Sequence, residues 1–193
     1  MRHLTLREVE QRASDFLEKY NSKNVFPLPI DEIVEIELKI FVCAVPGIKS
    51  LLGIDGFISS DFSQITIDES LYDNYLNRTR FTLAHEIGHF FLHRDWYQNN
   101  GPVDLKSYHK FYDDLDNQDY RYIENQAQTF AGLILVPKDK LINEIKKRIG
   151  HIPSSESVAI LQPIINDLTD FFAVSEGVII KRMRKEEILK NSW

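Results

Sequence analysis

Apolar residues recur at helical spacing near the start of the chain and at strand spacing soon afterwards. Residues 5–20 predict an amphipathic helix, with an apolar face made of Leu6, Val9, Ala13, Phe16, Leu17 and Tyr20. Asp31 follows a proline-containing link and is placed to begin a short helix. The run "LKIFVCAV", residues 38–45, predicts a buried strand.

The next two β-type runs predict a hairpin. "GIDGFISSD" and "SQITIDES", residues 53–61 and 63–70, are joined at Asp61–Ser63. In the second run, Ile65 and Ile67 alternate with polar residues, which is the pattern of a half-buried strand.

The second half of the chain is predominantly helical in pattern. Residues 80–93 predict one helix, begun at Asn77 or Thr79, and residues 120–136 predict another that ends near Pro137. Between them, residues 94–119 are polar, rich in aromatic residues and aperiodic, and predict a long loop in which substrate choice is decided.

Further helical segments are expected before the C-terminus. Residues 137–149 predict a helix closed by Gly150. A helix then starts after the cap region Ser154–Ser155, and Pro163 is expected to kink or break it. The remaining residues predict two short helices about a turn at Val174–Ser175.

These elements predict an α+β fold that is mainly helical, with a small antiparallel or mixed sheet before the helix at 80–93. We expect residues 1–150 to form the main domain and residues 151–193 to form a C-terminal helical subdomain packed on it, or the whole chain to be a single domain. With 193 residues, of which 43% are hydrophobic, the chain has ample material for a core.

Charge and cysteine content narrow the functional classes. The net charge of −6 argues against a dedicated nucleic-acid surface, which usually carries a basic excess. The single cysteine, Cys43, excludes a disulfide within the chain, and its apolar run predicts a buried strand position. No signal-peptide core or membrane-length apolar run occurs, so we expect a soluble cytoplasmic protein.

The stretch "RFTLAHEIGHFFLH" carries the clearest chemical signal. His85 and His89 are four residues apart and therefore lie on one face of a helix, where both imidazoles can reach one ion. Glu86 projects about 100° round the helix and can act on water beside the metal without binding it. This H-E-x-x-H pattern should occur by chance on the order of 0.01 times in such a chain, so it predicts a metal site.

A third ligand is needed, because catalytic zinc sites usually have three protein ligands. His93 lies a further turn along the same helix and cannot easily converge on the same ion. We expect it to contact a ligand from behind, to face the substrate or to have a structural role, and the structural role is favoured. His109 lies among aromatic and acidic residues and is a weaker candidate, and His3 and His151 lack any supporting context. Glu124, near the start of a second apolar helix, is the best candidate.

Two blocks of the chain, residues 80–93 and 123–137, resemble the ImmA/IrrE-type metallopeptidases. The first is an H-E-[ILF]-G-H helix, and the second has the family pattern at Glu124, Ala127, Phe130, Ala131, Ile134, Leu135 and Pro137. Gln128 departs from this pattern, because the family often has Asn there.

The resemblance implies a zincin-like zinc endopeptidase. His85, His89 and Glu124 would bind one Zn²⁺ per chain, and Glu86 would be the catalytic acid/base. Manganese or iron stays open as the metal. Relatives act on transcriptional repressors in stress or mobile-element responses, so we expect a separate repressor as the substrate. The residue that assists the oxyanion is left open among His93, His109, Tyr108 and Tyr112.

Two other functions remain open. The pattern of the tail "LTDFFAVSEGVIIKRMRK" is similar to that of a helix-turn-helix. Residues 167–190 could then bind DNA through Lys181, Arg182, Arg184 and Lys185. The favoured interpretation of this tail is two packing helices with a solvated basic face. Alternatively, the protein binds zinc and a repressor without cleaving it, although the presence of Glu86 favours catalysis.

Overall fold

The structure is a computed structural model that describes residues 3–114, 117–153 and 156–189, except for the side chains of residues 109, 112–114, 117 and 118. The first part of the chain alternates helices and strands: α1 (Leu6–Tyr20), α2 (Ile30–Glu32), the π-helix η1 (Ile33–Glu37), β1 (Phe41–Val45), α3 (Ile48–Leu52), β2 (Gly56–Ile58), β3 (Gln64–Asp68) and α4 (Glu69–Asn74). The rest is helical: α5 (Leu76–Leu92), α6 (Arg94–Asn100), α7 (Leu105–Asp114), α8 (Asn117–Leu135), α9 (Lys138–Ile149), α10 (Val158–Phe172) and α11 (Glu176–Lys185). This composition confirms the predicted α+β fold, which is mainly helical.

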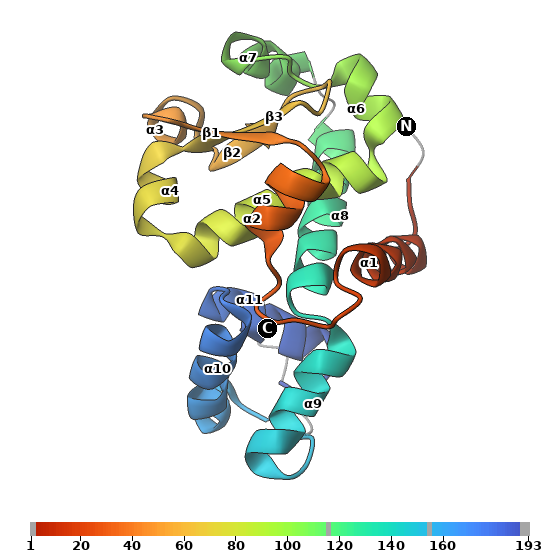
Figure 1. Ribbon diagram of the computed structural model, residues 1–193, viewed down its shortest axis with the longest axis vertical. Coiled ribbons are helices and arrows are strands. Elements are labelled where there is room, and N and C mark those ends of the chain that lie inside the picture. The colour runs from red at the N-terminus through yellow and green to blue at the C-terminus, as the bar shows by residue number, and fades with distance from the viewer. Residues whose placement is uncertain (1–2, 115–116, 154–155, 190–193) are drawn as a thin grey trace.

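Helix α1 begins where the sequence predicts. The Thr5 hydroxyl accepts a hydrogen bond from the Glu8 backbone N–H at 3.3 Å, and the Glu8 carboxylate accepts one from the Thr5 N–H at 2.8 Å. This reciprocal capping box satisfies two of the backbone donors that a helix start leaves without partners. The apolar face of α1 then packs against α8 (Figure 1).

The sheet has the strand order β1-β3-β2. Strand β2 pairs with β3 in an antiparallel hairpin, as predicted, and β1 pairs with β3 in parallel. Because β1 lies at an edge, it is not the buried strand that the sequence predicts: the Phe41 side chain is 63% exposed, and Cys43 is half-buried. Figure 1 shows the sheet with α3 and α4 beside it and α5 beneath it.

Strand β3 is more buried than its alternating pattern predicts. It is the central strand, and α3 and α4 pack against it, so Thr66 and Asp68 are buried together with Ile65 and Ile67. Asp68 is satisfied there, because its carboxylate accepts hydrogen bonds from the backbone N–H of Lys49 at 3.0 Å and from the Ser70 hydroxyl at 2.6 Å. Asp68 therefore joins β3 to α3 and to the start of α4, and does not mark a solvent-facing side.

The segment 94–119 is not the long loop that the sequence predicts. Helices α6 and α7 occupy most of it, while residues 115 and 116 lie outside the described part. Tyr97, Tyr108 and Phe111 are buried, and their rings contact one another and Phe57 of β2. The apolar positions Leu105, Tyr108 and Phe111 of α7 do recur at helical spacing, but α7 has only 10 residues and α6 only 7, so the signal is short and was missed.

The C-terminal helices follow the prediction in part. Helix α9 ends at Gly150, which has a φ of +79°, and α10 and α11 meet at the predicted turn around Val174–Ser175. Helix α10 continues through Pro163, so the predicted break does not occur; the proline lies in the second turn and removes only one backbone hydrogen bond there. The predicted cap residues Ser154 and Ser155 lie outside the described residues, and Ser157 occupies the N-cap position.

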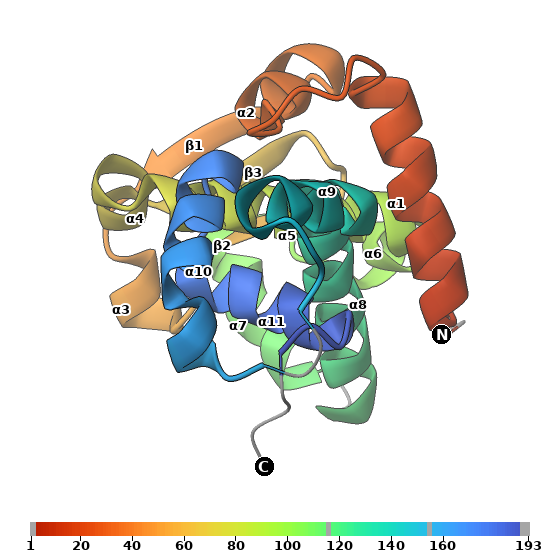
Figure 2. The same cartoon turned by 90° about the horizontal axis from the view of Figure 1, so that it is seen from below.

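Figure 1 shows α9, α10 and α11 gathered at the end of the molecule opposite to α7, and Figure 2 views the molecule from that end. Buried apolar residues of α10 and α11 join the same core cluster as those of α5 and α8. The division of the chain near residue 150 stays a prediction. Among the described helices, none is individually long and apolar enough to cross a membrane, although α10 and α11 together, bent by 110°, have the length and composition of a broken span.

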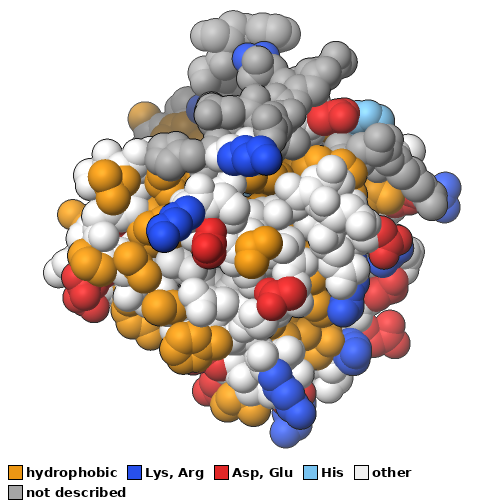
Figure 3. All heavy atoms as spheres, turned by 90° about the horizontal axis from the view of Figure 1, so that it is seen from above, with side chains coloured by type: hydrophobic (Ala, Val, Ile, Leu, Met, Phe, Trp, Pro, Cys, Tyr) orange, Lys and Arg blue, Asp and Glu red, His pale blue; other side chains and the backbone are white. Residues whose placement is uncertain are grey.

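Charges of both signs are interspersed on the face at the α7 end of the molecule. Figure 3 shows this face, with Lys and Arg side chains lying among Asp, Glu and hydrophobic side chains. The described part of this face therefore carries no extended patch of a single charge.

Candidate metal centre

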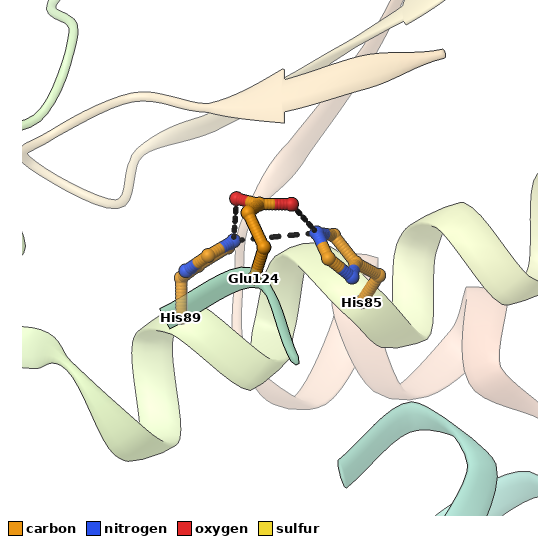
Figure 4. A group of neighbouring side chains, drawn as sticks. All are labelled: His85, His89 and Glu124. Carbon is orange, nitrogen blue, oxygen red and sulfur yellow. Dashed lines mark hydrogen bonds and ion pairs between the residues drawn. The ribbon is translucent and has the colours of Figure 1, made fainter. Parts of the chain in front are cut away.

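Helix α5 places His85 and His89 one above the other, as their spacing of four residues predicts. Their Nε2 atoms are 3.3 Å apart and point to the same side of the helix (Figure 4). His89 is buried, and the side chain of His85 is 14% exposed. The two ring nitrogens therefore converge at one place next to a cavity.

Glu124 comes from α8 and completes a group of three. Its Oε2 lies 3.1 Å from His85 Nε2, and its Oε1 lies 3.4 Å from His89 Nε2 (Figure 4). Ligand atoms bound at about 2.0–2.1 Å to a tetrahedral zinc ion lie about 3.3–3.4 Å from one another. The two imidazole nitrogens, 3.3 Å apart, have this spacing, and one carboxylate oxygen of Glu124 lies within 4.8 Å of both of them. The donor atoms and their arrangement therefore fit a divalent metal ion such as zinc.

The charges of the three side chains depend on one another. Burial by itself would raise the pKa of Glu124, but hydrogen bonds with His85 and His89 lower it well below its usual value. Burial would likewise lower the pKa of His85, but Glu124 raises it. For His89 burial prevails and lowers the pKa. The site thus favours an ionised carboxylate beside positive charge, which a metal cation would supply.

Close packing of α5 on α8 makes this convergence possible. At Gly88, a Cβ atom would lie 3.1 Å from the Ala127 Cα and 3.2 Å from the Ala127 carbonyl oxygen. Both distances are shorter than most contacts that Cβ atoms make in proteins. The two backbones can therefore approach this closely only because position 88 has no side chain. Gly88 lies between the two histidines, and Ala127 lies one turn beyond Glu124.

Glu86 lines the same cavity but is not part of the group of three. It is 4% exposed, and its Oε2 accepts a hydrogen bond of 2.9 Å from the Ile58 backbone N–H of strand β2. Burial raises the pKa of Glu86 to about 8. A carboxyl group with a pKa near neutrality can both accept and donate a proton at physiological pH.

His93 lies behind the site and contacts His89, not the place where an ion would bind. Its Nδ1 is 3.3 Å from His89 Nδ1, and its Nε2 is 2.8 Å from the side-chain oxygen of Gln126. Gln126 in turn donates from Nε2 to the Leu4 carbonyl at 2.6 Å. Burial lowers the pKa of His93 to about 3, so this imidazole is neutral.

These contacts define one consistent set of proton positions. If His89 Nε2 binds a metal, its Nδ1 carries the proton and donates to His93 Nδ1. His93 then carries its own proton on Nε2 and donates to Gln126. This direct contact places His93 behind the ligand His89, which is one of the alternatives expected for it and not the favoured structural role. It is not an oxyanion-assisting position, because His89 lies between His93 and the converging donor atoms.

The cavity beside the three side chains has a volume of about 270 Å³. Tyr97, Tyr108 and Tyr120 line it, and the Tyr97 ring packs against the His89 ring with their centroids 5.0 Å apart. Tyr97 and Gln126 are site residues that the sequence did not identify; the only available signal was their position, in an aromatic-rich segment and within the Glu124 helix. The side chains of His109 and Tyr112 lie outside the described part, and His3 and His151 contact Asp119 and the Ile149 carbonyl away from the site.

Comparison with known proteins places the chain in a family. No curated protein matches it by sequence. Among solved structures, a Mycobacterium tuberculosis transcriptional regulator has the same fold, with a TM-score of 0.57 at 14% identity; the match covers 92% of this chain but only 47% of that one. The family model of the IrrE N-terminal-like domain, a peptidase family, matches residues 59–184, a range that contains the whole metal centre. The chain therefore belongs to the IrrE N-terminal-like peptidase family.

Proposed function

We propose that the protein is a zinc-dependent endopeptidase that cleaves a cytoplasmic regulatory protein. The observation that carries this proposal is the convergence of His85, His89 and Glu124, with Glu86 beside them, on one cavity in a member of a peptidase family. A metal site that only stabilised the fold would need neither an open cavity nor a buried carboxyl group lining it.

Each residue has a defined task in this proposal. His85, His89 and Glu124 hold the ion, which when bound would acidify water and stabilise negative charge on the carbonyl oxygen of the substrate. Glu86 takes a proton from a water molecule in the cavity and returns it to the amine nitrogen as the peptide bond breaks. The Ile58 N–H holds one oxygen of Glu86, Oε2, and leaves Oε1 for this proton transfer.

The donor set supports zinc as the metal. Two imidazole nitrogens and one carboxylate, gathered within 4.8 Å of one another, are one of the usual ligand sets of catalytic zinc. Manganese and iron also bind such donors and are the alternatives. Metal analysis of protein purified without added metal distinguishes them.

We further propose that the substrate is a separate transcriptional repressor and that cleavage relieves repression in a stress or mobile-element response. The similarity in fold to a protein described as a transcriptional regulator supports a regulatory setting. The chain spans about half the length of that protein. The proposal of a repressor as the substrate therefore rests on family membership and fold together.

Replacing Glu86 with Gln tests the peptidase proposal. The zinc-loaded protein is incubated with repressor-like proteins encoded by neighbouring genes, and products are followed by mass spectrometry. The unmodified protein should cut one of them, a chelator should prevent this, and Glu86→Gln should retain zinc but lose at least about 100-fold in rate because the proton acceptor is gone. Full activity of Glu86→Gln would contradict the proposal.

A non-cleaving, zinc-bound regulator is the alternative function. It would bind a repressor through the same cavity without cutting it. A metal-loaded protein that binds its repressor and leaves the chain intact over long incubation would favour this alternative.

Direct DNA binding through residues 167–190 is the other alternative, and the structure lends it little support. Arg182 is buried, and its guanidinium donates to the Val136 carbonyl at 3.0 Å and to Glu186 at 2.9 Å. Only Lys181 and Lys185 of the four basic residues in this helix are exposed. A salt-dependent mobility shift of duplex DNA by the purified protein would favour this function.

A further inference from the structure

A second cavity lies between α8 and α11, next to the metal centre. We call it the α8–α11 groove. It has a volume of about 420 Å³. The residues that line it and determine its polarity and charge include Phe81, Thr129, Gly132, Val178, Lys181 and Lys185. Gly132 is buried on α8, and the nearest side-chain atom to a Cβ built there, Arg182 Cδ, would be 3.4 Å away.

The groove is continuous with the metal-centre cavity. Both are lined by Arg78, Phe81, Thr82 and Gln128. Thr82 lies one helical turn before Glu86 on α5, and Gln128 lies one turn after Glu124 on α8. On each helix, the residue that lines the groove is therefore displaced by about 5.4 Å along the axis from the residue at the metal centre. Because an extended chain advances about 3.3 Å per residue, a polypeptide at the metal centre would reach the groove within about two residues.

The interior of the groove suits an apolar side chain. The half-buried ring of Phe81 and the side chain of Val178 contribute apolar surface, and Gly132 leaves the space that a side chain would otherwise fill. Arg182 does not add charge to the interior, since its guanidinium is held by Val136 and Glu186. Burial of an apolar side chain in such a site is favourable by the usual hydrophobic effect.

The edge of the groove is positively charged. Lys181 Nζ lies 3.4 Å from the side-chain oxygen of Gln128, and Lys185 Nζ lies 3.4 Å from the Thr129 hydroxyl. Among the described residues, neither ammonium group is paired with a carboxylate. Asp55, the acidic residue of the groove, is already paired with Arg78 at 2.6 Å and with Lys49 at 2.8 Å. On a chain with a net charge of −6, these two lysines form a local basic site.

We infer that the α8–α11 groove is a substrate subsite that binds an apolar residue flanked by acidic residues, about two residues from the bond that is cut. The inference rests on the proposed peptidase function for its position in the reaction. It names the chemistry of the substrate segment: an apolar side chain enters the groove, and neighbouring carboxylates pair with Lys181 and Lys185.

Peptide binding tests this inference without requiring cleavage. Two fluorescein-labelled peptide pools are used, in which a central Leu is flanked on both sides by Glu or by Lys and all other positions are randomised. Fluorescence anisotropy measures their binding to zinc-loaded Glu86→Gln protein. The Glu pool should bind about tenfold more tightly than the Lys pool, and this preference should shrink as salt is raised.

Charge-reversal variants test whether Lys181 and Lys185 cause the preference for the Glu pool. Lys181→Glu combined with Lys185→Glu should abolish or reverse it, whereas Lys23→Glu combined with Lys146→Glu makes the same change in net charge at exposed positions outside the groove and should preserve it. Gly177→Leu is an independent steric variant, because a Cβ there has no atom closer than 4.0 Å and the longer side chain should narrow the groove. It should weaken binding of the Glu pool with Lys181 and Lys185 intact.

Several results would overturn the inference: equal binding of the two pools, a preference that survives reversal of Lys181 and Lys185, or tighter binding of duplex DNA than of the Glu pool at the same salt. Cleavage of the pools by the unmodified zinc-loaded protein is measured separately. Binding preference together with no cleavage of the pools or of the repressor-like proteins would support the groove and reject the peptidase function. Cleavage without any binding preference for the Glu pool would support the peptidase function and reject the proposed role of the groove.

Discussion

His93 contributes to the metal centre through its contact with His89. The contact between the two Nδ1 atoms fixes the orientation and protonation of the His89 ring, and Gln126 fixes His93 in the same way. Partners of this kind hold a ligand in its binding geometry and typically change metal affinity about 10–100-fold when removed. His93 is therefore a positioning residue.

His93→Leu should weaken zinc binding about 10–100-fold, because His89 loses the acceptor that orients it. His93→Asn should recover part of this loss, since its side-chain oxygen can accept from His89 Nδ1. Zinc affinity is measured by competition with a chromophoric chelator, and thermal unfolding of the metal-free proteins serves as the control. Equal zinc affinity in the unmodified and His93→Leu proteins would contradict the positioning role.

The packing of α5 on α8 determines the geometry at the scale of elements. Gly88 and Ala127 let the two helices approach closely enough for Glu124 to join the histidines. A methyl group at position 88 would have to displace backbone of α8, whereas a methyl group at Gly132 would meet only the flexible Arg182 side chain at 3.4 Å. The two glycines thus offer a matched comparison within one helix pair.

Gly88→Ala should lower zinc affinity and destabilise the fold by up to about 2 kcal/mol, because overpacking of about 1–3 kcal/mol outweighs a gain of about 1 kcal/mol in helix propensity. Gly132→Ala should leave zinc affinity unchanged and be neutral or stabilising. Urea unfolding and zinc competition measure both effects. If the two substitutions behaved alike, close approach at Gly88 would not be what positions Glu124.

The elements also show what the sequence could predict. The helix with His85 and His89 and the helix with Glu124 are 17 and 19 residues long and dense in apolar residues, so their existence was predictable, and the spacing of the histidines alone indicated their shared face. The aromatic helices α6 and α7 have only 7 and 10 residues, so the helical spacing of Tyr108 and Phe111 in α7 is a much shorter signal. The exposure of β1 depends on the strand order β1-β3-β2, which is a property of the assembled sheet and leaves no local signal in "LKIFVCAV".

At the scale of the whole molecule, Arg80 connects distant parts of the chain. Its guanidinium donates to the Leu28 carbonyl at 2.6 Å and to the Ala173 carbonyl at 3.2 Å, and it lies 3.4 Å from the Asp31 carboxylate. It therefore links α5 to the segment before α2 and to the turn between α10 and α11. The sequence contained no sign of this role, because all three partners are far from Arg80 along the chain.

Arg80→Met should lower the free energy of unfolding by about 3–5 kcal/mol, since it leaves the buried Leu28 carbonyl and the other polar partners without their donor. Arg121→Met, on an exposed position of α8, should change it by less than about 0.5 kcal/mol. Urea unfolding of the metal-free proteins measures both values. A loss at Arg80 no larger than that at Arg121 would refute this account of how the N-terminal and C-terminal segments are held to α5.

His85, His89 and Glu124 together bind one zinc ion in the proposed site, and a titration of the purified protein with zinc measures this. Metal-free protein is titrated with Zn²⁺ against a competing chelator, and bound metal is counted by mass spectrometry under native conditions. The proposed site implies one zinc ion per chain, an affinity more than about 100-fold weaker for Glu124→Gln, and no change for His151→Ala. A chain that binds no zinc, or a Glu124→Gln variant that binds it as tightly as the unmodified protein, would contradict it.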